Sequence, residues 1–303
     1  MNPDQDLPAS LSTPEPLLIP PHAKDLGGGF SVRRLLPSAA RAAVGPFIFF
    51  DHFGPVVAQP SDNHDVRPHP HIGLATVTYL FDGAMQHRDS TGAVQRIEPG
   101  AINWMTAGRG IVHSERTPDD LRAVPRRSHG LQLWAALPAA DEEIEPGFAH
   151  TPAAAIPEIQ IGGATVRVLI GSAYGQTSPV ATRSPTLYLD ILLRAGASLV
   201  LPEAAERALY GVDAGYALDG RPLPAFSMRV LGASEPGVIS ATQEARVVLI
   251  GGEPLGHRFL WWNFASSRKQ RLIQAGEDWA AGRFDAVPGE TEFIPLPVTR
   301  PAA

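Results

Sequence analysis

Two short stretches of this sequence carry pairs of strong metal-ligand side chains at the same spacing. The first contains His69 and His71, and the second, further along the chain, contains His113 and Glu115. Side chains at positions i and i+2 of an extended strand point to the same face of a sheet. Two such strands side by side would direct three imidazoles and one carboxylate at a common point. This set suits a divalent transition metal, because imidazole is a good ligand for such ions and the carboxylate adds charge.

A lone His-x-His pair is a weak signal, since histidines on strands more often belong to a surface or a core. The second pair makes a metal site the better interpretation, because it follows a glycine-rich turn at 107–110 and lies on another predicted strand. Four ligand types at matched spacing therefore predict a metal site. The set accepts iron, nickel, manganese, cobalt, copper or zinc, and availability in the cell decides among them as much as affinity does.

The composition favours a turn-rich globular protein. A chain of 303 residues is long for one domain, so two domains are expected. The 44% of hydrophobic residues suffice for a sizeable core, and the 30 prolines disfavour long helices. Because the chain has no cysteine, disulfides, thiolate metal sites and cysteine nucleophiles are excluded.

Charge and hydropathy limit the classes of partner. The net charge of -6 argues against direct binding to nucleic acid or to an anionic membrane surface. No apolar run approaches the length that spans a membrane, and the amino terminus lacks the pattern of a secretory signal. The sequence therefore predicts a cytoplasmic protein without a nucleic-acid or membrane partner.

The order of segments predicts an all-β protein made of two tandem, jelly-roll-like β-barrels. Residues 1–25 hold six prolines and no aromatic residue, and they are expected to form an extended leader. In 26–140 short strands alternate with glycine-containing turns, which predicts the first barrel. Residues 141–160 are rich in proline and acidic side chains and are expected to be a linker. Residues 161–303 repeat the pattern of short predicted strands, which predicts the second barrel.

Period-two patterns and turn signals place the individual strands. They are expected at 30–36, 47–50, 72–81, 84–89, 93–98, 101–106, 111–116 and 129–134, and then at 166–171, 186–194, 197–201, 207–212 and 246–250. One helix is expected near 267–282, beginning at a capping box formed by Ser267 and Gln270. Its apolar positions, among them Leu272 and Ala275, should dock on a barrel.

Several longer motifs identify a family resemblance. They are Asp51–Pro55, His69–Gly73, Thr76–Tyr79, His87–Ser90, Trp104–Glu115 and Gln132–Pro138. With these motifs the sequence resembles the pirin family of the cupin superfamily over residues 30–140. Beyond residue 140 the resemblance rests on the layout of two barrels and a late helix.

The resemblance implies a bicupin, with two cupin barrels and one metal, usually Fe(II), in the amino-terminal barrel. By motif, His69, His71, His113 and Glu115 match the four metal-ligand positions of the family. Many relatives have a glutamate where this chain has Ala75, and we expect this change to alter the polarity of the pocket beside the metal. The second half has no histidine between 150 and 257, so no second site of this type is expected.

The resemblance also implies an activity, because pirins include quercetin 2,3-dioxygenases. The expected substrates are a flavonol-like or enolic aromatic compound and dioxygen. Glu115 is the catalytic candidate, which would either remain a ligand or accept the proton of the substrate hydroxyl. The alternative is a metal- and redox-responsive regulator that binds a protein partner without turning over a substrate, since fold does not fix function.

Three other positions leave alternatives open at the level of sequence. His52 could line the pocket or brace the Asp51–Pro55 turn. His87 could orient a ligand through a hydrogen bond or belong to a solvated hairpin face. Arg109 could face an anionic substrate or water. Trp104, with its neighbour Met105, is expected to pack in the core.

Overall fold

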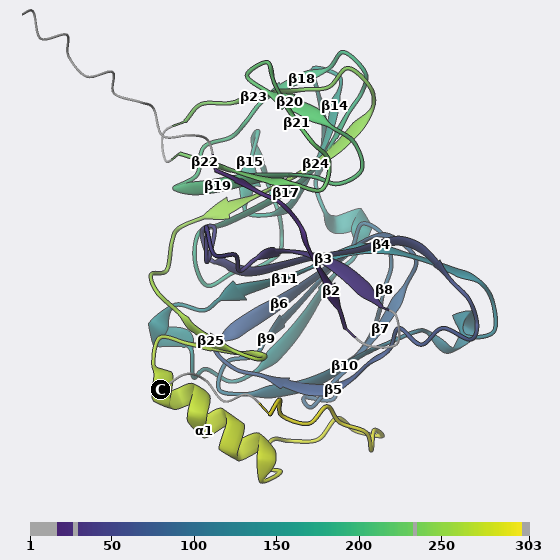
Figure 1. Ribbon diagram of the computed structural model, residues 1–303, viewed down its shortest axis with the longest axis vertical. Coiled ribbons are helices and arrows are strands. Elements are labelled where there is room, and N and C mark those ends of the chain that lie inside the picture. The colour runs from purple at the N-terminus through teal and green to yellow at the C-terminus, as the bar shows by residue number, and fades with distance from the viewer. Residues whose placement is uncertain (1–16, 27–29, 233–234, 299–303) are drawn as a thin grey trace, which may run out of the picture.

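Two β-barrels stacked one on the other make up the protein (Figure 1). The computed structural model describes residues 17–26, 30–232 and 235–298. Each barrel combines one seven-stranded and one four-stranded antiparallel sheet, and one α-helix follows the second barrel. The expected fold class, an all-β pair of cupin barrels with a late helix, is therefore confirmed.

The first barrel carries both stretches of candidate ligands. Its seven-stranded sheet has the order β12-β9-β6-β11-β4-β3-β2, with β2 (His22–Asp25), β3 (Ser31–Leu36), β4 (Phe47–Ala58), β6 (Leu74–Asp82), β9 (Ile102–Thr106), β11 (Arg126–Ala136) and β12 (Gly147–Thr151). Its four-stranded sheet has the order β5-β10-β7-β8, with β5 (Val66–His71), β7 (Met85–Asp89), β8 (Val94–Ile97) and β10 (Ile111–Arg116).

The second barrel repeats this arrangement. Its larger sheet has the order β1-β22-β19-β24-β17-β14-β13, with β1 (Leu18–Ile19), β13 (Glu158–Ile161), β14 (Ala164–Ile170), β17 (Thr186–Leu193), β19 (Glu206–Gly211), β22 (Met228–Leu231) and β24 (Ala245–Gly252). Its smaller sheet has the order β18-β23-β20-β21, with β18 (Ser198–Val200), β20 (Tyr216–Leu218), β21 (Arg221–Leu223) and β23 (Val238–Ser240).

Short elements complete the chain. Two small hairpins pair β15 (Ser172–Ala173) with β16 (Gln176–Thr177) and β25 (Phe259–Trp261) with β26 (Phe264–Ser266). Three 3-10 turns, η1 (Asp119–Leu121), η2 (Ala139–Asp141) and η3 (Ala153–Ala155), lie in loops, and the helix is α1 (Lys269–Ala280). In the part of the chain that the structure describes, no helix is both long and apolar enough to cross a membrane.

Every strand expected from the sequence is present, but one boundary differs in a way that matters for the site. The strand expected at 72–81 begins only at Leu74, because Gly73 has a φ of +67° that breaks the extended conformation. A Cβ on Gly73 would lie 2.1 Å from the carbonyl oxygen of Ala265, so the position also requires a glycine for space. This glycine separates the ligand strand β5 from β6.

The segments outside the expected barrels take part in the sheets. In the leader, β1 pairs with β22 of the second barrel and β2 pairs with β3 of the first, whereas residues 1–16 lie outside the described part. The expected linker at 141–160 supplies β12 to the first barrel and the start of β13 to the second. The domain boundaries at 26–140 and 161–303 stay predictions. In the structure β13 reaches residue 161, and β2 and β12, which lie outside 26–140, pair within the sheet of the first barrel.

The start of the helix corrects one expectation. The predicted capping box is wrong, because α1 begins at Lys269 and, among the described residues, no side chain caps its first turn. The Ser267 hydroxyl instead donates to Glu142 Oε2 at 3.0 Å, and the Ser267 N–H donates to Glu142 Oε1 at 2.8 Å. A buried carboxylate is the stronger acceptor, and it draws Ser267 away from the helix.

The expected docking of the helix on a barrel is confirmed. Leu272 and Ala275 of α1 are buried together with Ile72 and Phe264 in one apolar cluster. Ile72 directly follows the ligand strand β5, and it forms an isolated bridge with Phe264 of β26. The helix therefore stabilises the barrel that carries the candidate ligands.

The two seven-stranded sheets pack against each other through the largest apolar cluster of the protein. This cluster joins Phe47, Phe50 and Trp104 of the first barrel with Tyr188 and Tyr210 of the second. Trp104 and its neighbour Met105 are both buried, as expected. Because the interface is apolar and continuous, the barrels should move as one unit.

His52 joins the barrels through hydrogen bonds inside this interface. It is fully buried, its Nδ1 lies 2.7 Å from the Tyr210 hydroxyl, and its Nε2 lies 2.8 Å from Nε2 of His129. Both earlier interpretations of His52, as a pocket residue and as a brace for a turn, are therefore wrong. The sequence of β4 gave no sign of its partner, because Tyr210 is on the other barrel.

The His52 contact predicts that acid destabilises the protein. Burial lowers the pKa of His52 to about 3 and, with Arg246 nearby, lowers the pKa of His129 to about 4. The unfolded chain binds protons below about pH 6.5, whereas the folded interface keeps both rings neutral. The free energy of unfolding is thus highest above pH 6.5 and falls as the pH drops towards 4, by up to ~1.4 kcal/mol per pH unit for His52.

Melting temperatures measured from pH 7.5 to pH 4.5 test this prediction. In His52→Gln, which keeps a side chain able to bond Tyr210, the fall should be shallower than in the unchanged protein. Parallel curves for the two proteins would show that His52 does not carry the acid sensitivity.

Candidate metal centre

The pairing of the smaller sheet brings the two candidate stretches together. Strand β10 lies between β5 and β7, and it runs antiparallel to both. Its His113 lies opposite His69 on β5 and opposite Asp89 on β7. Opposed residues of an antiparallel pair have side chains close enough to touch on one face. The register therefore places the histidines of both stretches on the same face.

Three of the four candidate side chains converge. The ligand nitrogens of His69, His71 and His113 all lie within 4.8 Å of one another, and Nε2 of His71 is 3.1 Å from Nε2 of His113. All three rings are buried. Among the residues that the structure describes, this is the one group of three or more histidine and acidic side chains close enough to share an ion.

The electrostatics of the three rings favour a bound cation. Burial lowers the pKa of His69 to about 4 and holds the pKa values of His71 and His113 well below the usual 6.5. All three imidazoles are therefore neutral at pH 7, which is the form that binds metals. Neutral, buried nitrogens that face one another fit a divalent metal of the borderline class.

Backbone carbonyl groups orient two of the rings. The Nδ1 atom of His69 lies 2.8 Å from the carbonyl oxygen of Arg67, and Nδ1 of His71 lies 3.0 Å from the carbonyl oxygen of Asn263. A carbonyl accepts only, so each Nδ1 carries the proton and each Nε2 keeps its lone pair for a metal. Asn263 lies beyond the second barrel in the sequence, and no sequence signal pointed to it.

A series of buried hydrogen bonds between side chains orients the third ring, that of His113. Nδ1 of His113 lies 3.5 Å from Nδ1 of His87, and Nε2 of His87 lies 2.8 Å from Oδ2 of Asp89. The Asp89 carboxylate is fixed in turn by the N–H and hydroxyl of Thr91. His87 is buried, so the solvated hairpin interpretation is wrong and the interpretation as an orienting residue fits.

This chain predicts a loss of metal affinity in Asp89→Asn. The amide lacks the charge that holds the His87 proton, so His113 should be less well oriented. Removal of such an outer partner weakens metal binding by about tenfold or more. Competition with a chromophoric chelator for Ni²⁺ measures this, and Asp120→Asn, which changes an exposed acid on the same barrel, is the control. Equal affinities of the two variants would contradict the prediction.

Glu115 lies beside the histidines but does not join their group. The pairing of β10 with β5 shifts between His113 and Glu115, where Arg67 and Pro68 of β5 lie opposite Ser114 alone, whereas the pairing of β10 with β7 stays regular. Burial raises the pKa of the Glu115 carboxyl to about 7, and a hydrogen bond with Thr78 opposes this effect. The Thr78 hydroxyl is also 2.9 Å from Gln132 Oε1.

A small cavity leads from the surface to Glu115. It has a volume of about 40 Å³ and lies where β7 and β11 begin, with Phe30, His64, Met85 and Arg126 among its lining residues. The rings of Phe30 and His64 stack at 4.8 Å. Glu115 is half-buried and is thus the candidate residue that a molecule entering here would meet first.

The positions of Ala75 and Arg109 in the structure decide two further expectations. Ala75 is fully buried and shares a face with Val77 and Tyr79 in the cluster between the barrels. The expected change in pocket polarity is therefore wrong, because alternation along β6 puts Ala75 opposite to Thr78. Of the two interpretations of Arg109, the one in which it faces water fits, because its exposed side chain pairs with Glu145 on the surface at 2.7 Å.

Comparison with known proteins agrees with this architecture. The Pirin family model matches residues 29–135, and the model of the Pirin C-terminal cupin domain matches residues 188–285. The chain belongs to the pirin family. This pirin is 47% identical to a pirin-like protein of Caulobacter vibrioides, over 90% of this chain and 96% of the relative.

Two other relatives carry a name that refers to an activity. A protein of Pseudomonas aeruginosa named "Putative quercetin 2,3-dioxygenase PA1205" is 38% identical over 88% of this pirin and 86% of its own length. The crystal structure of a quercetin 2,3-dioxygenase from Acinetobacter baumannii superposes with a TM-score of 0.88 at 33% identity. It covers 95% of this pirin and 96% of that chain.

Proposed function

We propose that this pirin is a metal-dependent dioxygenase of the quercetin 2,3-dioxygenase type, acting on flavonol-like or enolic aromatic substrates. The observation that carries the proposal is the convergence of three buried, neutral imidazoles, His69, His71 and His113, in the first barrel. These rings would hold one divalent metal, and Fe(II) is the metal we expect first. The names of the Pseudomonas and Acinetobacter relatives support the reaction class.

The chain supplies a neutral ligand set and one acid–base group. When bound, a divalent metal at this centre supplies Lewis acidity toward an enol oxygen and a redox partner for dioxygen. His69, His71 and His113 would hold it through Nε2, while their Nδ1 atoms stay engaged with the protein. The Glu115 carboxyl has a pKa of about 7, which is matched to taking a proton from a substrate hydroxyl near neutral pH.

The surroundings of Glu115 limit the substrate. Thr78 and Gln132 offer hydroxyl and amide groups beside the carboxylate, whereas Phe30 and Met85 offer apolar contact. This mixture suits a flat aromatic molecule with hydroxyl groups. A flavonol is larger than the cavity of about 40 Å³, so we expect the side chains at its mouth to move when a substrate enters.

Oxygen uptake with a panel of flavonols and catechols tests the proposal. The protein is assayed after loading with Fe(II), Ni²⁺ or Mn²⁺ and again after complete chelation. Turnover that appears with one metal and disappears on chelation supports the dioxygenase. Turnover that persists in chelated, metal-free protein would contradict a metal-dependent reaction.

The same samples separate the enzyme from the rival function. A partner protein captured by only one oxidation state of the metal, without any turnover, would favour the redox-responsive regulator. The partners proposed here are a small aromatic substrate and dioxygen. The cytoplasmic location stays a prediction.

A further inference from the structure

The chain returns to the first barrel after it has completed the second. From β24 it runs to the β25–β26 hairpin and then to α1, and the last described stretch passes below β5 and β10 (Figure 1). We call Phe259–Val298 the return segment. It lies on the outside of the sheet whose inner face carries His69, His71 and His113.

The return segment contacts both ligand strands. On β5, the Asn263 carbonyl accepts a hydrogen bond from His71 Nδ1 at 3.0 Å, and the Ile294 N–H donates to the Pro68 carbonyl at 2.8 Å. On β10, the Ser114 hydroxyl donates a short hydrogen bond to Glu290. Every one of these contacts is within one residue of a candidate ligand or on the ligand itself.

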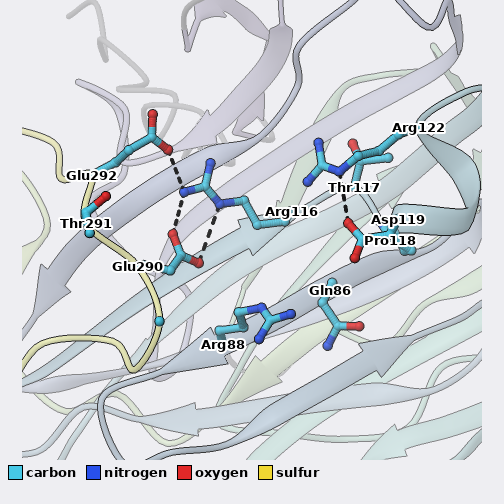
Figure 2. Close-up of a pocket in the computed structure, with 11 residues that line it drawn as sticks. Gln86, Arg88, Arg116, Thr117, Pro118, Asp119, Arg122, Glu290, Thr291 and Glu292 are labelled. Atoms are coloured by element: carbon cyan, nitrogen blue, oxygen red, sulfur yellow. Dashed lines mark hydrogen bonds and ion pairs between the residues drawn. The ribbon is translucent and has the colours of Figure 1, made fainter.

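Glu290 bonds to β10 at the point where the pairing of β10 with β5 is irregular. Ser114, which is fully buried, lies between His113 and Glu115, where the pairing with β5 is irregular. Arg116, two residues further along β10, forms ion pairs with Glu290 and, at 2.8 Å, with Glu292 (Figure 2). A bulge gives up part of the ladder that holds a strand in place, so a bond from outside has more effect there than elsewhere.

Polar contacts hold this part of the return segment. Val287 is buried, whereas the residues after it, 288–298, are exposed or half-buried. The stretch around Glu290 borders a hollow of about 470 Å³, into which Arg88 and Gln86 also face (Figure 2). Besides the Glu290 carboxylate, the backbone of Ile294 and the partly buried Leu296, which packs on the cluster of α1, attach this stretch.

A second carboxylate, that of Glu142, binds the part of the return segment that precedes α1. Glu142 is buried, and it accepts hydrogen bonds from the hydroxyls of Ser266 and Ser267 and pairs with Arg258 at 2.9 Å. These bonds fix β26, and β26 directly follows the Asn263 carbonyl that orients His71. The return segment is thus tied to the first barrel on both sides of α1.

We propose that the return segment holds the metal ligands in place, with Glu290 as the positioning residue for His113 and Glu115. The proposal rests on the metal centre of the proposed function. In this arrangement Glu290 touches no metal and no substrate. It fixes Ser114, and Ser114 fixes the backbone between the two candidate ligands.

Glu290→Gln tests the proposal, with Glu292→Gln as its matched control. Both changes remove one carboxylate charge beside Arg116 on the same stretch, but only Glu290 contacts Ser114. In Glu290→Gln the dissociation constant for Ni²⁺ should rise about three- to tenfold, less than for an outer partner bonded directly to a ligand. The visible bands of bound Co²⁺, which report ligand geometry, should shift as well. In Glu292→Gln both quantities should stay as in the unchanged protein.

Ser114→Ala provides an independent variant. It removes the donor, whereas Glu290→Gln keeps a neutral oxygen that can still accept from Ser114, so Ser114→Ala should weaken Ni²⁺ binding at least as much as Glu290→Gln. The double variant should be no weaker than Ser114→Ala, because both changes act on one contact. Equal effects of Glu290→Gln and Glu292→Gln, or additive effects with Ser114→Ala, would overturn the proposal.

The outcomes distinguish this proposal from the proposed function. If His71→Ala leaves Ni²⁺ binding unchanged, the metal centre itself is wrong. If His71→Ala abolishes binding while Glu290→Gln does not change it, only the positioning role is wrong. Neither readout depends on oxygenase turnover.

Discussion

Replacing His113 with alanine is expected to weaken Ni²⁺ binding by about 100-fold or more and to leave the fold intact. His113 is the central ring of the group, since its strand lies between β5 and β7 and its Nε2 faces that of His71 at 3.1 Å. Structural metal sites with four ligands are worth about 10–16 kcal/mol, so one ligand accounts for roughly 3 kcal/mol. A loss of that size exceeds what a surface histidine could cause.

The control for this variant is His150→Ala. His150 lies on β12 of the same barrel, is half-buried and pairs with Asn103 at 2.7 Å, but it is outside the group of three. Isothermal titration with Ni²⁺ measures both variants, and their melting temperatures show whether they fold. Similar Ni²⁺ affinities in the two variants would show that His113 is not a ligand of the metal centre.

Glu115→Gln is expected to lower oxygenase turnover by about 100-fold or more while metal binding changes much less. A general base contributes about 10²- to 10⁴-fold, whereas the three histidines proposed as metal ligands remain. The base form is the deprotonated one, so turnover of the unchanged protein should rise with pH. Burial puts the pKa of Glu115 at about 7, and a cation nearby lowers it, so the rise should be centred at or below pH 7.

The pH profile of turnover and a Ni²⁺ titration of the same variant separate the two roles of Glu115. If the metal affinity falls as far as the turnover does, Glu115 acts as a ligand, not as the base. If turnover in Glu115→Gln matches that of the unchanged protein at every pH, Glu115 has neither role in the reaction.

The three histidines could be predicted because their signal is local. His69 and His71 are two residues apart on one strand, and His113 follows a glycine turn on another. Alternation along each strand then decides the face without knowledge of the rest of the fold. The same rule placed Glu115 with them, and the irregular pairing of β5 with β10 beside it is what the rule could not foresee. A bulge arises from the pairing of two strands and has no signature in one of them.

Contacts between distant parts of the chain account for the other features of the structure that the sequence did not predict. Asn263 acts on His71 through a backbone carbonyl across 192 residues, so its side-chain type carries no information. Glu290 acts across 176 residues, and nothing in its neighbourhood resembles a site. The failed capping box has the same cause, since the buried Glu142 competes for Ser267.

The central claim is that one metal binds between His69, His71 and His113. Crystals grown with Ni²⁺ and measured at the nickel absorption edge test it most directly. One strong anomalous peak is expected in the first barrel, about 2.1 Å from the three Nε2 atoms, as is usual for imidazole ligands. A peak elsewhere, or no peak between these rings at full nickel loading, would contradict it.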